Sequence, residues 1–487
     1  MYASKNMEET ISLKKKSMIS TASLFLQSGY SAVLGFIANI VLTIYLSPKI
    51  FGIYITVLSI IALLNYFSDI GLAASLIQRE KIDDDDVKTA FTMQQIIISS
   101  LIILGILLTQ PIMKFYGLAY DGKILYWTLL AGFFISSLKT IPSVFLERHL
   151  NFHKIVTVQV IENTAFYVTV SLLALSGFGL MSFAWGVLVR AFTGLILMYS
   201  LSPWMPRFGI SKKSMSHLLS YGVPFQSMSF LALFKDELVT LLLGKLIGFE
   251  KLGYIGWAKK WAESTLRIIM DNVSKVVFPL FARIQTDKAK QSTVLNKVLR
   301  YQSMIIIPSL LGIALVMPLI VDVLPQYKKW EPALPLFYIF IASSLFTSYL
   351  TPFINFFSAI GKIKLSLGFM VFWTVMMWVL VYPLTTLFGI YGFPLTILAI
   401  AMTSVFVAMK ARTMVPYNFI ESTYKYFISG FIMFIVTIMV RYYTTGIQIG
   451  LLRIMLVVAT GIFSYYLSLL LLFKENLIRD LHAEYHT

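Results

Sequence analysis

The chain has 487 residues, of which 58% are hydrophobic and 13% are charged, and its mean hydropathy is +0.79. Soluble domains carry about 25% charged residues, so this composition predicts a polytopic membrane protein. The chain has no cysteine, which excludes disulfides, thiolate metal sites and cysteine nucleophiles. Its net charge of +17 would indicate a nucleic-acid partner in a soluble protein, but most basic residues lie in short loops between apolar runs. We therefore expect no nucleic-acid partner.

Apolar runs of about 20 residues, the length that crosses a hydrocarbon core of roughly 30 Å, recur along nearly the whole chain. Only helices satisfy the backbone hydrogen bonds of such runs in lipid, which predicts an all-α fold. Segment 1–17 mixes acidic and basic residues before a long first run, so we expect a cytoplasmic segment and not a cleaved signal peptide. About 14 transmembrane helices are expected, at 18–46, 52–77, 87–113, 123–147, 154–176, 180–202, 219–246, 253–280, 298–323, 332–359, 363–385, 388–409, 424–443 and 449–473.

The loop charges predict the orientation. With both termini in the cytoplasm, most lysines and arginines of the loops fall on the inner side, as the positive-inside rule requires. The acidic run from Asp83 to Asp86 counts little in that rule, and we expect it to be a solvated loop and not a metal site. The longest loop, 203–218, is too short for a soluble catalytic domain. A membrane glycosyltransferase or polymerase usually needs a larger loop, so a transporter is favoured over an enzyme.

Two short echoes indicate an internal repeat. SPKIFGIY at 47–54 resembles GFEKLGYI at 248–255, and GFGLMSFAWGVL at 177–188 parallels LFGIYGFPLTIL at 387–398. Chance similarity between short glycine-aromatic loops is the alternative explanation. Two matches at similar offsets predict two six-helix lobes in one orientation, as in transporters built from parallel repeats. The expected layout is a cytoplasmic segment 1–17, an N-lobe 18–203, a cytoplasmic linker 204–218, a C-lobe 219–412, two further spans 413–473 and a cytoplasmic tail 474–487.

Charged residues inside predicted spans are candidates for function. Each costs at least about 2.5 kcal/mol at the bilayer centre, so it usually faces a wet cavity or an opposite charge. The stretch WAKKWAESTLRIIMDNVSKVVFPL at 257–280 places Lys260, Glu263, Arg267, Asp271 and Lys275 along one helical face. Alternatively, pairs such as Lys260 with Glu263 or Arg267 with Asp271 only neutralise each other. Outside this stretch the intramembrane charges are Asp69, Lys139, Glu162, Arg190, Lys235, Asp236, Glu237 and Asp322.

Three longer segments carry a family resemblance. They are FGIYITVLSIIALLNYFSDIGLAASLIQRE at 51–80, PSVFLERHLNFHK at 142–154 and VVFPLFARIQTD at 276–287. The chain resembles the polysaccharide-repeat-unit flippases of the multidrug, oligosaccharidyl-lipid and polysaccharide exporter superfamily. Asp69, Glu147 and Arg148 fall in these motifs.

The resemblance implies two six-helix lobes around a central cationic cavity and no cofactor. It also implies that an oligosaccharide on undecaprenyl diphosphate crosses the bacterial cytoplasmic membrane by alternating access, for O-antigen, capsule or exopolysaccharide synthesis. A proton or sodium gradient is the expected drive. Expected partners are the glycolipid, membrane lipids, a polysaccharide polymerase and glycosyltransferases, and the chain is expected to act as a monomer. A flippase for the peptidoglycan precursor and a multidrug exporter of the same superfamily are the alternatives.

A diphosphate needs a basic lining, because lysine and arginine are the side chains that bind phosphate. The predicted lining consists of Lys259, Lys260, Arg267, Lys275, Arg190 and Lys235. Release of the substrate requires that this attraction be compensated. The predicted ion-coupling residues are Glu162, Asp236, Glu237, Glu263 and Asp271.

Overall fold

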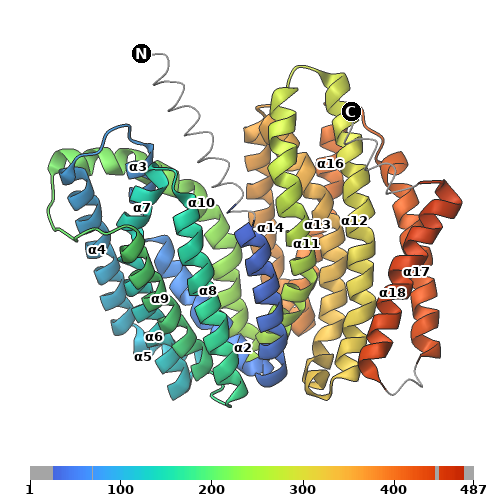
Figure 1. Cartoon of the computed structure of the whole chain (residues 1–487), viewed down its shortest axis with the longest axis horizontal. Coiled ribbons are helices and arrows are strands. Elements are labelled where there is room, and N and C mark those ends of the chain that lie inside the picture. Colours follow the sequence, from blue (N-terminus) through green and yellow to red (C-terminus); the bar gives the residue numbers. More distant parts are fainter. Residues whose placement is uncertain (1–22, 24–25, 69, 445–448, 476–487) are drawn as a thin grey trace. The chain divides into compact units, whose positions relative to one another are not determined.

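The computed structural model describes residues 23, 26–68, 70–444 and 449–475 (Figure 1). Within these ranges the protein is helical and contains no strand, which confirms the predicted all-α fold. The motif residue Asp69 lies outside the described residues. Several side chains inside helices α10 and α11 also lie outside the description, and those of Asp271 and Lys275 are among them.

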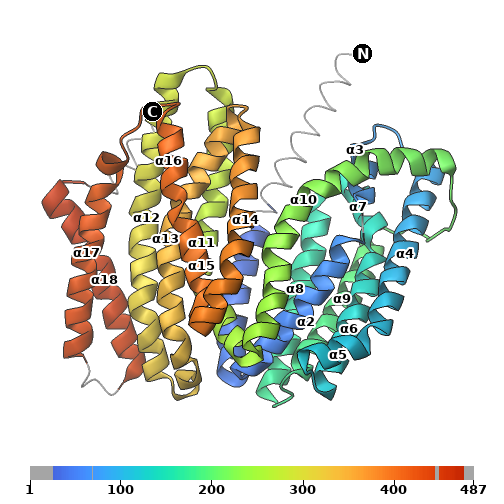
Figure 2. The same cartoon turned by 180° about the vertical axis from the view of Figure 1, so that it is seen from behind.

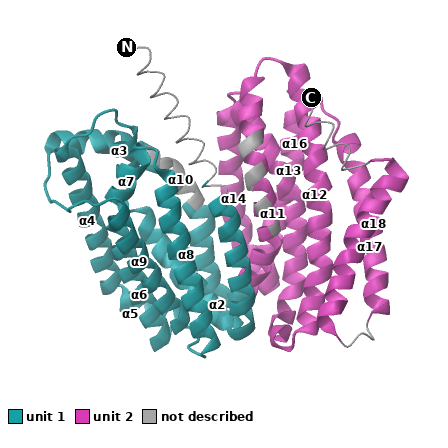
Figure 3. Ribbon diagram, in the orientation of Figure 1, with its two compact units in different colours: residues 1–253 teal, residues 254–487 magenta. Residues whose placement is uncertain are grey.

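Backbone contacts divide the chain into two compact units, residues 1–253 and 254–487 (Figure 3). The helices of unit 1 are Leu26–Tyr45, α2 (Pro48–Tyr66), α3 (Leu72–Gln78), α4 (Asp84–Leu107), α5 (Thr109–Tyr116), α6 (Tyr120–Ser137), α7 (Thr140–Arg148), α8 (Phe152–Leu175), α9 (Met181–Leu201) and α10 (Lys212–Ile247). The next helix, α11 (Phe249–Arg283), begins just before the boundary and continues into unit 2. The other helices of unit 2 are α12 (Lys288–Val323), η1 (Pro325–Ala333), α13 (Leu334–Ala359), α14 (Ile363–Phe388), η2 (Gly389–Tyr391), α15 (Gly392–Met402), α16 (Ser404–Arg412), α17 (Phe419–Tyr443) and α18 (Gly450–Phe473).

Eleven segments within the described residues are long and apolar enough to cross a membrane, as expected for a multi-pass membrane protein. The predicted spans 363–385 and 388–409 both fall in one of these segments, Ile363–Arg412. The predicted spans 219–246 and 253–280 are helical, as α10 and α11, but these charged helices are not among the eleven. The total of 14 spans therefore stays a prediction.

The two echoing stretches at the starts of α2 and α11 contact each other. A Cβ atom on Gly52 would stand 1.7 Å from the carbonyl oxygen of Phe249, and one on Gly253 would stand 1.9 Å from that of Pro48. Gly52 matches Gly253 in the repeat, and Pro48 matches Phe249, so the contact is reciprocal. Two copies related by a two-fold axis make contacts of this kind. The reciprocity supports the internal repeat and explains why both positions need glycine.

The core of unit 1 joins helices that are distant in sequence. Leu76 on α3, Phe91 on α4, Val144 on α7 and Leu218 on α10 are buried in one cluster. The repeat assigns α10 to the second lobe, yet this helix packs against α2, α3, α4 and α5. The contacts of α10 therefore place it with unit 1, while the predicted lobe boundaries themselves stay a prediction.

The core of unit 2 is aromatic. Phe281 on α11 meets Phe356 on α13 edge-on, with ring centroids 5.1 Å apart, and Leu299 on α12 and Val407 on α16 are buried in the same cluster. The C-terminal helices α17 and α18 pack on α12. Just after α18, the carboxylate of Glu475 accepts hydrogen bonds from Lys425 and Tyr426 of α17 at 2.8 and 2.9 Å and lies 3.4 Å from a terminal nitrogen of Arg300 on α12. These contacts attach the last two helices to the rest of unit 2.

Candidate functional site

Unit 1 contains a buried carboxylate between two cations. The side chain of Glu162, in the middle of α8, is only 5% exposed. Its Oε2 is ion-paired with Nζ of Lys139, and its Oε1 lies 3.8 Å from a terminal nitrogen of Arg190 on α9. We call these three residues the unit 1 triad. Three separate segments supply its charges, which leave one positive charge uncompensated.

A break between α6 and α7 positions Lys139. Pro142 has no N–H to donate to the carbonyl of Leu138, four residues earlier, so the helix cannot continue regularly through this point. The hydroxyl of Tyr199 on α9 donates to that carbonyl at 3.1 Å. Lys139 is the first residue after the break and precedes α7. The proline therefore places an ammonium group beside Glu162, and the tyrosine satisfies the freed carbonyl.

Gly194 on α9 provides the room for this ion pair. A Cβ atom at this position would stand 2.0 Å from Oε2 of Glu162 and 2.9 Å from Nζ of Lys139. Any larger residue would displace both charged groups from their present positions. Glycine at 194 is thus a requirement of the unit 1 triad and not of the backbone conformation.

The unit 1 triad lines a cavity of about 370 Å³. Its polar lining also includes Asn65 and Ser136, and its other walls are aromatic or aliphatic side chains of α2, α6, α8 and α9. The guanidinium of Arg190 lies 6.0 Å from the ring centroid of Phe166, and its side chain is 48% exposed. A guanidinium donates in a planar fork that matches phosphate oxygens. The cavity therefore combines anion-binding groups with the aromatic walls that suit a sugar or lipid.

Unit 2 contains a second group of one carboxylate and two cations, all on α11. Oε1 of Glu263 lies 3.8 Å from Nζ of Lys259, and its Oε2 lies 3.5 Å from a terminal nitrogen of Arg267. We call these residues the unit 2 triad. Its members are spaced four residues apart, so they follow one face of a single helix. Lys259 also lies over the ring of Phe393 on α15, at 5.6 Å from the centroid.

The unit 2 triad is more open than the unit 1 triad. The side chain of Arg267 is 75% exposed, and that of Glu263 is 25% exposed. Both border a cavity of about 230 Å³, whose polar lining on α13 is formed by Ser343, Ser344 and Thr347. Hydroxyl groups and a guanidinium can together bind an anionic or hydroxylated ligand.

The structure corrects one predicted pair. Glu263 pairs with Lys259 and Arg267, so the alternative of neutralising pairs along α11 holds for this residue, with Lys259 in place of Lys260. Lys260 is exposed, while Ala258 and Ala262 on the opposite face of α11, and Trp257 and Trp261 beside it, are buried. The polar stripe is therefore present over the part of α11 whose side chains are described. The predicted pair of Arg267 with Asp271 lies outside the described side chains.

Other predicted residues lie apart from the two triads. Among the described residues, Lys235, Asp236 and Glu237 of α10 form no ion pair with one another or with a triad. Asp322 pairs with Arg453 of α18 at 3.2 Å. Sequence reasoning identified Lys139 only as an intramembrane charge and missed Gly194, because nothing in the local sequence connects either one to Glu162.

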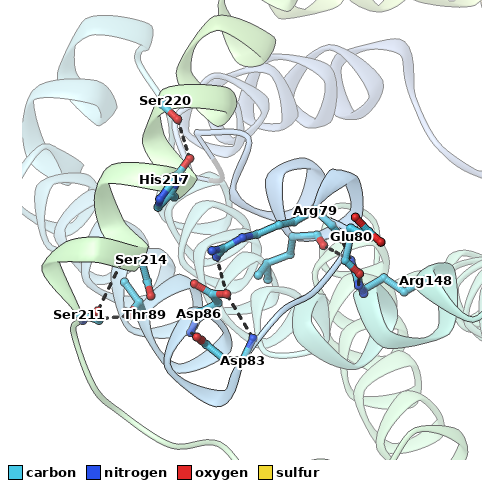
Figure 4. A network of polar contacts seen from close by, with 11 residues as sticks. Arg79, Glu80, Asp83, Asp86, Thr89, Arg148, Ser211, Ser214, His217 and Ser220 are labelled. Atoms are coloured by element: carbon cyan, nitrogen blue, oxygen red, sulfur yellow. Dashed lines mark hydrogen bonds and ion pairs between the residues drawn. The ribbon is translucent and has the colours of Figure 1, made fainter.

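The two motif residues Glu147 and Arg148 have structural contacts. Arg148 donates to the carbonyls of Leu76, Arg79 and Glu80, the last at 3.0 Å, and so closes the open end of α3 (Figure 4). Glu147 accepts from the hydroxyl of Ser143 at 3.1 Å. Arg148 therefore holds the loop that leads from α3 to α4.

The acidic run in that loop is not simply a solvated surface. Asp86 is 1% exposed and ion-paired with Arg79 (Figure 4). Asp83 and Asp86 each accept from the backbone N–H of the other, at 2.8 and 3.2 Å, and so cap α4. The prediction of a solvated loop is thus wrong for Asp86, because its pairing with Arg79 needed the tertiary fold.

The chain matches known sequences over most of its length. The family model described as "Polysaccharide biosynthesis protein" matches residues 41–335. The succinoglycan biosynthesis transport protein ExoT of Rhizobium meliloti (strain 1021) is 23% identical over 358 residues, 72% of this chain and 69% of that protein. The lipopolysaccharide biosynthesis protein WzxC of Escherichia coli (strain K12) is 24% identical over 373 residues, 75% of this chain and 73% of that protein.

Solved structures share the fold at lower sequence identity. The lipid II flippase MurJ in an inward closed conformation has a TM-score of 0.72 at 16% identity, over 95% of this chain and 99% of that one. An inward-facing multidrug resistance MATE family transporter has a TM-score of 0.60 at 14% identity, over 78% of this chain and 95% of that one. The chain therefore shares its fold with these transporters.

Proposed function

Because this chain belongs to the polysaccharide biosynthesis protein family, we propose that it is a flippase for lipid-linked oligosaccharides. Its cargo is a repeat unit on undecaprenyl diphosphate, moved from the inner to the outer leaflet of the bacterial cytoplasmic membrane by alternating access. The product serves O-antigen, capsule or exopolysaccharide synthesis. The relatives ExoT and WzxC, whose names place them in succinoglycan and lipopolysaccharide biosynthesis, support this assignment.

The observation that carries the proposal is the chemistry of the unit 1 cavity. The unit 1 triad has two cations for one carboxylate, and Arg190 keeps half of its side chain exposed beside the cavity. A diphosphate carries two to three negative charges and is strongly hydrated, so it binds where basic groups replace the lost water. Within unit 2, the exposed Arg267 of the unit 2 triad offers a basic contact of its own. We assign both arginines to the diphosphate.

In this proposal the carboxylates of the two triads cause the release of the diphosphate. Glu162 and Glu263 each lie between two cations, so each competes with the diphosphate for the same partners. Uptake of a proton or sodium ion by such a carboxylate would change that competition and bias a two-state equilibrium. The remaining predicted lining and coupling residues, Lys259, Lys260, Lys275, Lys235, Asp236, Glu237 and Asp271, belong to the same proposal.

Deletion of the gene, followed by extraction of the lipid fraction, tests the proposal. Undecaprenyl-diphosphate-linked repeat units should accumulate, and the wild-type gene should restore polymer export. Arg190→Gln and Arg267→Gln should fail to restore it at normal protein level, whereas Lys123→Gln, at a half-buried lysine whose ammonium lies over the ring of Trp127, should succeed. Export at the wild-type rate by both arginine variants would contradict the role of the arginines.

The fold favours one second candidate, a flippase for the peptidoglycan precursor. MurJ shares the architecture over nearly the whole chain. The same deletion separates the two functions, because accumulation of the peptidoglycan precursor without any oligosaccharide intermediate would support this candidate and overturn the first.

A further inference from the structure

The linker between α9 and α10 exposes a group of apolar side chains. Met205, Phe208 and Ile210 are 77%, 72% and 56% exposed. They lie beside the ends of two candidate spans, since α9 ends at Leu201 and α4 begins at Asp84. These three side chains line neither the cavity of the unit 1 triad nor that of the unit 2 triad, so the candidate site does not explain their exposure.

The backbone of this linker is fixed to α4. The N–H of Gly209 donates to Thr92 at 2.9 Å, and the N–H of Ser211 donates to Thr89 at 2.9 Å. The ring of Trp204 meets Phe91 edge-on, at 5.0 Å between centroids. The linker, residues 203–213, is therefore held in place on α4, and we call it the strap. Because its backbone is fixed, its apolar side chains stay exposed in the folded protein.

The first turns of α10 continue this surface. They lie across the ends of neighbouring helices before α10 turns to run alongside them (Figures 1 and 2). Ser214 and Leu218 face the core and are 4% and 0% exposed. The opposite face of these turns is exposed and polar and consists of Lys212, Lys213, Ser216, His217 and Ser220. These turns thus pack their apolar side on the core of unit 1 and expose their polar side, with two cations at its start.

The charges around the strap favour an anionic partner. Among the described residues, Lys212 and Lys213 form no ion pair. Of the neighbouring acids, Asp86 pairs with Arg79 (Figure 4), Asp84 pairs with Lys88 and Asp83 caps α4, while Asp85 is exposed and forms no ion pair among the described residues. Arg207 lies 3.8 Å from Asp84 with both side chains more than half exposed, a pair that solvent screens strongly.

We propose that residues 203–213 form an interfacial anchor that binds anionic phospholipid head groups of the cytoplasmic leaflet. Apolar side chains flanked by lysines are the chemistry of a segment that lies at the boundary between head groups and acyl chains. The loop charges predict that this side of the chain faces the cytoplasm, where the anionic lipids attract basic segments. The inference is independent of the cargo and of the proposed flippase activity.

A fluorophore attached at the strap tests the anchor. The chain has no cysteine, so Met205→Cys gives a single labelling site for bimane. The labelled full-length protein is placed in nanodiscs of phosphatidylglycerol mixed with phosphatidylcholine, or of phosphatidylcholine alone. We expect brominated acyl chains to quench the label more strongly than iodide in the water does. The difference between the two quenchers should be larger in the nanodiscs that contain phosphatidylglycerol. The same label at Ser216→Cys, on the polar face, should be quenched by iodide in both nanodiscs.

Two charge variants measure the lipid preference. In the labelled protein, Lys212→Gln with Lys213→Gln should remove the difference between the two nanodiscs, because each lysine near an anionic surface contributes roughly five-fold in affinity. The matched control, Lys49→Gln with Lys114→Gln, removes two exposed lysines predicted on the outer side and should leave the difference unchanged. If iodide quenches the label at Met205→Cys equally in both nanodiscs, the proposed anchor is wrong. The exposed apolar surface would then be a binding site for a soluble protein. A difference that persists in the Lys212 and Lys213 variant would overturn the role of the lysines.

Discussion

The unit 1 triad and the unit 2 triad have the same composition and different construction. Each places one glutamate between a lysine and an arginine. In unit 1 the three residues come from α8, α9 and the break before α7, and the glutamate is 5% exposed. In unit 2 all three lie on α11, and the glutamate is 25% exposed.

This difference determines how much each triad contributes to stability. A charge in a buried site is costly without its partners, and the removal of one partner leaves the others uncompensated. Exposed ion pairs four residues apart on a helix contribute only a few tenths of a kcal/mol each. The unit 1 triad should therefore hold helices together, while the unit 2 triad should affect transport with little effect on folding.

The largest effect is expected for Glu162→Gln. The change leaves Lys139, whose side chain is 21% exposed, without its carboxylate in a partly buried position, and we expect the free energy of unfolding to fall by about 3 kcal/mol. Thermal unfolding of the purified protein in detergent measures the loss. Adding Lys139→Met should recover part of it without recovering transport, because the uncompensated ammonium is then absent. An unchanged unfolding temperature for Glu162→Gln would show that Glu162 does not hold the helices together.

A smaller loss is expected for Gly194→Ala. The new Cβ atom would stand 2.0 Å from Oε2 of Glu162 and force it away from Lys139, at a cost of about 1 to 3 kcal/mol. Gly312→Ala on α12 is the matched control, because no atom lies within 4 Å of its Cβ. The control should be neutral or stabilising by about 1 kcal/mol in the same unfolding assay. If Gly194→Ala and Gly312→Ala change the free energy of unfolding equally, the unit 1 triad tolerates a Cβ atom at position 194.

The smallest effect on stability is expected for Glu263→Gln. It removes two ion pairs between residues four apart on one helix, in which Lys259 and Glu263 are half-buried and Arg267 is exposed, so the free energy of unfolding should change by less than about 1 kcal/mol. Export of polymer by cells that carry this variant should nevertheless fall if Glu263 balances Arg267 during transport. A loss of stability as large as that of Glu162→Gln would remove the contrast between the two triads.

The fold was predictable to a large extent. The apolar runs identify the helices, because lipid leaves no other way to satisfy the backbone. The repeat between 47–54 and 248–255 predicts a relation that the structure shows as the reciprocal contact of Gly52 with Phe249 and Gly253 with Pro48. The packing of α10 with unit 1 was not predictable, since it depends on how Leu218 meets α3, α4 and α7.

The unit 2 triad could be located from sequence alone, except that the lysine partner of Glu263 is Lys259 and not Lys260. Helical periodicity relates residues four apart, so the spacing of Lys259, Glu263 and Arg267 already places them on one face. The unit 1 triad could not be assembled in this way. Lys139 and Glu162 are 23 residues apart on different helices, and no local pattern joins them.

The sequence by itself determined the class of protein, the helices, the family and the polar face of α11. These properties depend on composition, on local periodicity and on motifs that lie within single segments. Only the tertiary structure decided that Glu162 meets both Lys139 and Arg190 beside Gly194, and that Asp86 is buried against Arg79. Contacts between helices depend on how side chains of distant segments pack in three dimensions, and neither hydropathy nor helical spacing contains that information.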